Sequence, residues 1–308
     1  MAELFEDASE IGTRARKSIP EARDRWQSRL LAPILAAAIL AFIAFGLLAT
    51  GEQGGRYKIA GVSLALAAVV ALMRSATVGG ALSGAIACFC MTWWTRDLQS
   101  PLGHSALAPL IALSAFIFAS TRAGRQQKQL RSLEERRGGR TSAQVLANLG
   151  VAALVVTPLG AYASALVGLH LPVAPLLLSA ACLAALAEAT ADTVSSEIGQ
   201  AFGNRTYMLT SLRRVHRGTD GGVSLPGTAA GVAGALFVVL IGSWSLRLDG
   251  RIGALVLLAT VIGFAADSLL GATLERRGWI GNDVVNLSST AATALSLFLL
   301  ARVTSAFQ

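Results

Sequence analysis

The chain has 308 residues, of which 54% are hydrophobic and only 14% are charged. Its mean hydropathy of +0.58 and its repeated apolar runs exclude an ordinary soluble domain, because a run of about 18–20 apolar residues can cross a bilayer as a helix. The net charge of +8 does not indicate a nucleic-acid polymer as partner, because the basic residues lie in loops between apolar runs. Three cysteines lie inside apolar segments, so no disulfide framework is expected.

In chain order, residues 1–29 form a mixed-charge segment that lacks the pattern of a secretory signal peptide. Nine apolar segments follow. Because backbone groups in lipid must bond within their own segment, we predict an all-α fold, a polytopic transmembrane bundle of about nine helices. The expected spans are 30–50, 58–73, 77–95, 104–120, 144–167, 172–191, 226–246, 252–273 and 284–303.

These spans divide the chain into four predicted regions. The first, 1–29, is a cytoplasmic N-terminal segment, and the second, 30–120, holds the N-terminal transmembrane helices. A basic cytoplasmic loop, 121–143, then precedes a core membrane domain, 144–308, that contains the active-site loops.

The basic residues predict the orientation of the chain. With the N-terminus placed in the cytoplasm, nine spans leave twenty of the 26 Lys and Arg residues in cytoplasmic loops. This bias is the one that the positive-inside rule describes. The loops on the other side are short and nearly featureless, so loop chemistry is expected on the cytoplasmic face.

The first polar cluster lies at the inner end of the sixth span, in the stretch AEATADTVSSEIGQ. On a helix, Glu188, Asp192, Ser195 or Ser196 and Gly199 share one face, because residues three or four apart are neighbours. Carboxylates near lipid usually face a polar cavity, and a hard cation such as Mg²⁺ takes oxygen ligands of this kind. The alternative is a helix end with solvated acids.

The second cluster is the stretch RRVHRGTDGGVSLPG, which has an unusual density of arginine and glycine. A glycine-rich turn can direct several N–H groups at an anion, and arginine suits phosphate. The alternative is a flexible loop that obeys the positive-inside rule. The candidate residues are Gly218, Thr219, Gly221 and Gly222 in the turn, Arg213, Arg214 and Arg217 as cations, and Asp220 as a metal ligand.

The third cluster is the stretch ADSLLGATLERRGWIGNDVVN. Asp267, Gly271 and Glu275 are spaced by four and share a helix face. Asn282 and Asn286, also four apart, open the ninth span, where Asn282 could instead cap the helix.

All three clusters terminate spans on the same membrane face, so their acids, amides, hydroxyls and arginines can converge. Phosphoryl transfer needs mainly positioning, metal charge and cationic donors rather than a reactive protein nucleophile. No Ser–His–Asp or Cys–His set is visible in the sequence. The glycines that continue the second cluster, Gly227, Gly231 and Gly234, are expected to pack helices together.

Four ordered stretches, QVLANLG, ATADTVSSEIG, GTDGGVSLPGTAAG and ADSLLGATLE…NDVVNLSS, resemble an integral-membrane family of formerly unknown function that includes the phytyl-phosphate kinases of plastids. The resemblance covers roughly 140–300. That family is distantly similar to CTP-dependent dolichol and phytol kinases and to CDP-diacylglycerol synthases, a link at the level of fold. Val194 stands where many members carry a bulky aromatic residue, which bears on the lipid pocket.

The resemblance implies a membrane-embedded kinase in the bacterial inner membrane, with its active site on the cytoplasmic face. It would transfer a phosphoryl group from a nucleoside triphosphate, CTP by resemblance, to an isoprenoid monophosphate such as phytyl or geranylgeranyl phosphate. One or two Mg²⁺ ions would be the cofactor. The expected partners are the isoprenoid lipid monophosphate, the nucleotide and membrane lipids, with a homo-oligomer as a further expectation.

The same motifs imply the roles of individual residues. The expected catalytic residues are Asp192, Asp220 and Asp267. The expected metal ligands are these three together with Glu197 and Asp283. The expected substrate-binding residues are Arg213, Arg214, Arg217, Gly218, Thr219, Gly221, Gly222, Ser196, Ser268, Asn282 and Asn286.

Two other functions remain open at this point. A lipid-phosphate cytidylyltransferase would use the same metals and the same cationic loop, but it would release pyrophosphate instead of a nucleoside diphosphate. A transporter of an anionic lipid or small anion is the other alternative. Transporters usually place their polar groups near mid-membrane and show paired repeats, and neither feature is evident here.

Overall fold

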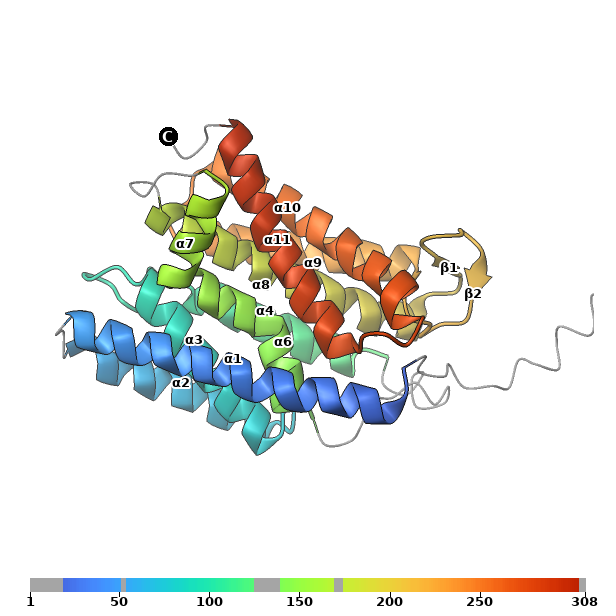
Figure 1. The fold of residues 1–308 in the computed structure, drawn as a ribbon, viewed down its shortest axis with the longest axis horizontal. Helices are drawn as coiled ribbons and strands as arrows, with labels where there is room; N and C mark the ends of the chain where they lie inside the picture. The colour runs from blue at the N-terminus through green and yellow to red at the C-terminus, as the bar shows by residue number, and fades with distance from the viewer. Residues whose placement is uncertain (1–18, 51–53, 125–138, 169–173, 305–308) are drawn as a thin grey trace, which may run out of the picture.

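The computed structural model describes residues 19–50, 54–124, 139–168 and 174–304, and helices dominate it (Figure 1). The predicted all-α membrane fold is confirmed. Residues 1–18 of the N-terminal segment and most of the basic loop lie outside the described residues. In chain order the helices are α1 (Glu21–Thr50), α2 (Gly54–Leu72), α3 (Val78–Thr95), α4 (Leu107–Arg122), α6 (Ser142–Val155), α7 (Pro158–Leu166), α8 (Ala174–Phe202), α9 (Leu225–Ser245), α10 (Gly250–Leu270) and α11 (Asn282–Thr304).

Three short strands and one π-helical turn complete the fold. The strands are β1 (Thr206–Met208), β2 (Arg214–Val215) and β3 (Gly222–Val223), which form an antiparallel sheet in the order β2-β1-β3. We call residues 203–224 the hairpin, and the end of the bundle that carries it the hairpin end (Figure 1). The π-helical turn η3 (Gly271–Glu275) continues α10 at this end.

All nine predicted apolar segments are helical, but not all qualify as spans by length and composition. Seven helices among the described residues do, and an eighth span results if α6 and α7 are counted together. Helix α4 has 16 residues, or about 24 Å at 1.5 Å per residue, against a hydrocarbon core of about 30 Å. The predicted number of nine therefore stays a prediction.

The predicted fifth span is broken into α6 and α7, which meet at 75°. Thr157 caps α7 by accepting a hydrogen bond from Leu159, and Pro158 is its first residue. Proline lacks the N–H that would continue α6 and restricts the residue before it. The bend also requires glycine at position 160, because a Cβ atom on Gly160 would overlap the carbonyl oxygen of Val155.

Helix α8 is the centre of the bundle, packed against α4, α6, α9, α10 and α11 (Figure 1). In its most apolar window 89% of the residues are buried, against 17% for α1 and α2, which face outward. Glycines on α9 allow its close approach. A Cβ atom at Gly227 or Gly231 would lie 2.6 or 2.5 Å from a backbone carbonyl of α8, and Gly234 also contacts α8. The predicted helix-packing role of these glycines is confirmed.

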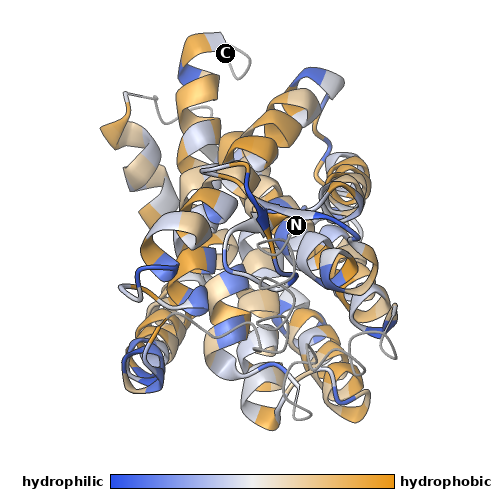
Figure 2. Cartoon of the chain, turned by 90° about the vertical axis from the view of Figure 1, so that its right-hand side faces the viewer, coloured by the Kyte–Doolittle hydropathy of each residue, from blue (hydrophilic) through white to orange (hydrophobic). Residues whose placement is uncertain are grey.

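Exposed aromatic residues mark both ends of the bundle. Trp26 at the start of α1 and Trp279 before α11 lie at the hairpin end, while Tyr57 at the start of α2 and Trp244 at the end of α9 lie at the opposite end. Aromatic side chains favour the interface between lipid and water. Figure 2, viewed from the hairpin end, shows hydrophilic loops between apolar helices. Helix α1 begins at this end and α11 finishes at the other (Figure 1).

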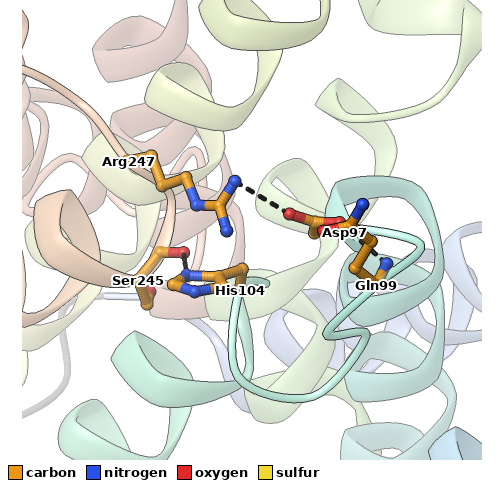
Figure 3. Close-up of polar contacts among 5 residues, drawn as sticks. All are labelled: Asp97, Gln99, His104, Ser245 and Arg247. Atoms are coloured by element: carbon orange, nitrogen blue, oxygen red, sulfur yellow. Dashed lines mark hydrogen bonds and ion pairs between the residues drawn. The ribbon is translucent and has the colours of Figure 1, made fainter.

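At the opposite end, two loops are joined by polar contacts (Figure 3). Arg247 after α9 lies 2.9 Å from the carboxylate of Asp97 after α3. The Nδ1 atom of His104 lies 3.2 Å from the carbonyl oxygen of Ser245, so this nitrogen is the donor. These contacts border a cavity of about 120 Å³. The loops expected to be featureless thus hold α3, α4 and α9 together at this end.

A substitution in the α8–α9 interface tests the packing. We expect Gly231→Ala to destabilise the protein by about 1–3 kcal/mol, because the added Cβ atom would overlap the backbone of Ala191. Gly61→Ala on α2 is the matched control, since nothing lies within 4 Å of its Cβ position. Thermal unfolding in detergent measures both. Equal melting temperatures for the two variants would contradict the close contact.

Candidate functional site

The glycine-rich stretch is a folded element. The backbones of Gly218 and Gly221 have φ angles of 76° and 71°, a region that favours glycine. Gly221 also packs against the start of η3, where a Cβ atom would lie 2.2 Å from the backbone nitrogen of Ala272. The hairpin therefore packs against the end of α10.

Acidic residues from two helices meet beside this contact. The carboxyl group of Asp267 on α10 is hydrogen-bonded to that of Asp192 on α8, and Glu188 and Glu275 lie within electrostatic reach. The side chain of Ser289 on α11 lies beside Glu188, and its hydroxyl donates to the carbonyl of Asn286 at 3.1 Å. We call Glu188, Asp192, Asp267 and Glu275 the carboxylate cluster. Its residues come from α8, α10 and η3.

Two oxygens of the carboxylate cluster are shielded from solvent without a hydrogen-bond partner among the described residues. They are Oε1 of Glu188, a residue that is only 1% exposed, and Oδ1 of Asp267. Two carboxylates at hydrogen-bond distance repel each other unless a proton or a cation lies between them. Buried acceptors of this kind fit a hard cation, which prefers oxygen ligands.

The cluster does not form a complete protein cage for a metal. In the part of the chain that the structure describes, no set of three or more His, Cys, Asp or Glu side chains is arranged to hold an ion alone. Magnesium, however, typically binds through one or two carboxylates together with water and substrate phosphates. The residues present fit that mode of binding, with Asp192 and Asp267 as the pair.

The other predicted metal ligands have different surroundings. Glu197 accepts a hydrogen bond of 3.3 Å from Thr121 on α4. At 100° per residue it lies about 140° around α8 from Asp192, so it faces away from that side chain. Asp220 lies in the hairpin turn next to Gly221, which contacts η3. Asp283 accepts a hydrogen bond of 2.6 Å from Ser28.

The predicted substrate-binding residues fall into two groups. Arg213 and Arg214 line a cavity between the hairpin and the end of α10, whereas Arg217 donates to Asn204 within the hairpin. The Thr219 hydroxyl donates a hydrogen bond of 2.7 Å to the carbonyl oxygen of His216, within the turn. The rest are spread over three helices: Ser196, exposed on the Asp192 side of α8; Ser268, half-buried beside Asp267; Asn282, exposed at the first residue of α11; and Asn286, buried one turn later.

Sequence reasoning placed Glu188 on the same face as Asp192 but did not include it among the site residues. Its position one turn before Asp192 was the available signal. Glu275 likewise shares a face with Asp267, but it was not assigned a role. Arg276, which lines the cavity with Arg213 and Arg214, was counted only as a charge in a loop.

The first turns of α1 hold the connection between α10 and α11. The helix begins at Glu21 and not near residue 30 as expected, because its polar residues have partners there. Gln27 donates to the carbonyl of Trp279 and accepts from the backbone nitrogen of Gly281 at 2.7 Å. Arg23 donates to the carbonyl of Gly278. Together with the Ser28–Asp283 contact, these bonds fix where α11 begins.

These features define a class of protein: a helical integral membrane protein with buried carboxylates and a cationic hairpin at one end. A family model described as "Integral membrane protein DUF92" matches residues 61–294. The chain belongs to this family. Helix α1, which holds the start of α11, lies outside the matched region.

Three relatives extend the comparison. The protein VTE6, chloroplastic, of Arabidopsis thaliana is 28% identical over 230 residues, which are 72% of this chain and 67% of that protein. An uncharacterized membrane protein of Synechocystis sp. is 32% identical over 201 residues, 61% of this chain and 72% of its own. An uncharacterized membrane protein of Methanocaldococcus jannaschii is 42% identical over 111 residues, 35% of this chain and 45% of its own. No solved structure matches significantly.

The contact between α1 and Asp283 can be tested on its own. We expect Ser28→Ala to destabilise the protein by about 1.5–3 kcal/mol, because the buried carboxylate of Asp283 loses a short hydrogen bond. Arg25→Ala is the control: its 3.7 Å pair with Glu21 is exposed to solvent, and such pairs contribute little. Melting temperatures in detergent provide the measurement. If both variants unfold at the wild-type temperature, α1 does not hold this connection.

Proposed function

We propose that the protein is a membrane-embedded prenyl-phosphate kinase. It transfers the terminal phosphoryl group of a nucleoside triphosphate, CTP in this proposal, to an isoprenoid monophosphate such as phytyl or geranylgeranyl phosphate. It acts with Mg²⁺ on the cytoplasmic face of a bacterial inner membrane. The observation that carries the proposal is the pairing of Asp192 and Asp267, from different helices, beside an arginine-bearing hairpin at one end of the bundle.

The chemistry of phosphoryl transfer suits this combination of groups. The bond between the terminal phosphorus and its bridging oxygen breaks, and a new bond forms to an oxygen of the acceptor phosphate. The products are a nucleoside diphosphate and an isoprenoid diphosphate. The acceptor is a phosphate monoester, already ionised near neutral pH, so no strong general base is required. The protein mainly positions two anions and offsets their charge.

In this proposal the polar residues have separate roles in binding the metal and the phosphates. Asp192, Asp220 and Asp267, with Glu188 beside them, would hold Mg²⁺, which supplies positive charge to the phosphate oxygens. Glu197 and Asp283 are further ligand candidates at the edge of this group. Asn282, Asn286, Ser196 and Ser268 would orient phosphate oxygens, and the prenyl tail would lie between the helices.

Two further observations support the proposal. The sequence motifs resemble a family that includes phytyl-phosphate kinases, and the relative in Arabidopsis thaliana is a chloroplast protein that matches 72% of this chain. The position of the polar residues also favours an enzyme over a transporter. The cationic hairpin and Asp267 lie toward one end of the helices, where a water-soluble nucleotide can reach them, although Glu188 lies halfway along α8.

A single substitution tests the role of the carboxylate pair. We expect Asp192→Asn to lower the rate of phosphoryl transfer by about 100-fold or more, because an amide does not supply the negative charge that the metal requires. Asp249→Asn is the matched control. It lies at the opposite end, where its side chain caps α10, and asparagine caps helices equally well.

The assay uses purified protein, geranylgeranyl or phytyl monophosphate and labelled CTP, ATP, GTP or UTP. Full activity of Asp192→Asn would refute the assigned role of this residue. Release of pyrophosphate in place of a nucleoside diphosphate would refute the kinase and indicate the cytidylyltransferase. Flux of an anion without nucleotide turnover would indicate the transporter.

Metal removal provides an independent measurement. We expect EDTA to reduce the transfer of labelled phosphate to background, and excess Mg²⁺ to restore it, because one carboxylate pair binds the ion only together with substrate phosphates. Activity that persists after exhaustive chelation would contradict the proposed role of the carboxylate cluster.

A further inference from the structure

A cavity lies between the hairpin and the end of α10. Its volume is about 500 Å³, within the range of about 300–1,000 Å³ typical of sites for small molecules. Arg213 and Arg214 approach it from the hairpin, and Arg276 approaches it from the turn after η3. The hydroxyl groups of Thr210 and Ser211 line it as well. Its polar lining is therefore made of hydrogen-bond donors from two separate elements.

The three arginines carry a charge that the described part of the chain does not neutralise. None of their guanidinium groups pairs with a carboxylate there. Arg276 donates only to the Sδ atom of Met208, at 3.7 Å, and a thioether is a weak acceptor. Like charges gathered around one cavity repel each other and raise the local concentration of anions. A guanidinium group also matches the geometry of phosphate oxygens.

The cavity is next to the carboxylate cluster. Gly221 of the hairpin packs on Ala272, which itself lines the cavity. Asp267 lies on the same continuous segment, one helical turn before Gly271. Ala272 therefore connects the wall of the cavity to the segment that carries Asp267, although no residue of the carboxylate cluster lines the cavity itself. Arg217, the third predicted cation, donates to Asn204 and does not line this cavity.

We propose that this cavity is a polyphosphate-binding site, formed by Arg276 together with Arg213 and Arg214. Its identity as the place of the nucleotide donor rests on the proposed kinase function, but its ability to bind polyphosphate does not. Arg276 completes the site from the opposite wall and orients the phosphate chain toward the carboxylates. The hydroxyl groups of the hairpin add neutral donors.

Binding of inorganic triphosphate to the full-length protein in nonionic detergent tests the site without any turnover. We expect Arg276→Gln to weaken binding about tenfold or more, measured by titration calorimetry, since it removes charge-assisted hydrogen bonds to the ligand. Arg276→Lys should retain part of the affinity because it keeps the charge. The matched control is Arg277→Gln, whose guanidinium group lies 5.7 Å from the ring of Trp279 and does not line the cavity.

The outcomes separate the binding site from the proposed kinase function. Wild-type affinity for triphosphate in Arg276→Gln, or an equal loss in Arg277→Gln, would overturn the assignment of the cavity. Displacement of triphosphate by phosphatidic acid in mixed micelles, lost in Arg276→Gln, would overturn it in favour of a lipid headgroup. Binding that depends on Arg276 in a protein without kinase activity would support the site and refute the proposed function. An inactive Asp192→Asn variant that still binds triphosphate supports both.

Discussion

The contact between Asp192 and Asp267 is the constraint on which the arrangement of this bundle depends. Each residue belongs to a long apolar helix, where a carboxyl group is energetically costly unless it has polar partners. Their meeting requires α8 and α10 to run side by side, and the hydroxyl of Thr260 supports this by reaching the carbonyl of Ala184 from α10. Because Ser289 contacts Glu188 in the same region, α11 is held to the same point.

The charges of the hairpin end are layered. The acids lie on the inner side, between helices, and the arginines of the cavity lie on the outer side. Electrostatic interactions are stronger where water is excluded, so a phosphate chain between the layers would contact cations on one side and acids on the other. The acids alone would repel it. A divalent ion would resolve this conflict, and this is the physical reason for our proposal of metal-dependent phosphoryl transfer.

Much of this arrangement could be predicted from spacing within one segment. The four-residue intervals that join Glu188 to Asp192 and Asp267 to Glu275 placed these acids on shared faces, and span counting brought both faces to one membrane side. Partners far apart in the sequence could not be predicted. Ser28 and Asp283 are 255 positions apart, and no periodicity links them. Thr157 and Pro158 indicate the break of the fifth span in the sequence, but hydropathy alone predicts one continuous helix there.

The direction of Arg276 was unpredictable for another reason. It follows a π-helical turn, which contains an extra residue compared with an α-helical turn, so ordinary helix spacing assigns it to the wrong side. Such turns depend on the local fit between the backbone and its neighbours, here the packing of Gly221 on Ala272. The glycine in the hairpin and the turn in α10 therefore have to be understood as one unit.

Because α10 continues directly into η3, this segment fixes the spacing between the residues that it carries. Asp267 lies on α10 and Arg276 directly follows η3, so the hydrogen-bonded backbone of one continuous segment sets the spacing between their Cα atoms. Adding or removing a single residue between them would swing one side chain around the axis by about 100° relative to the other. Tolerance for length variation should therefore end abruptly at this segment.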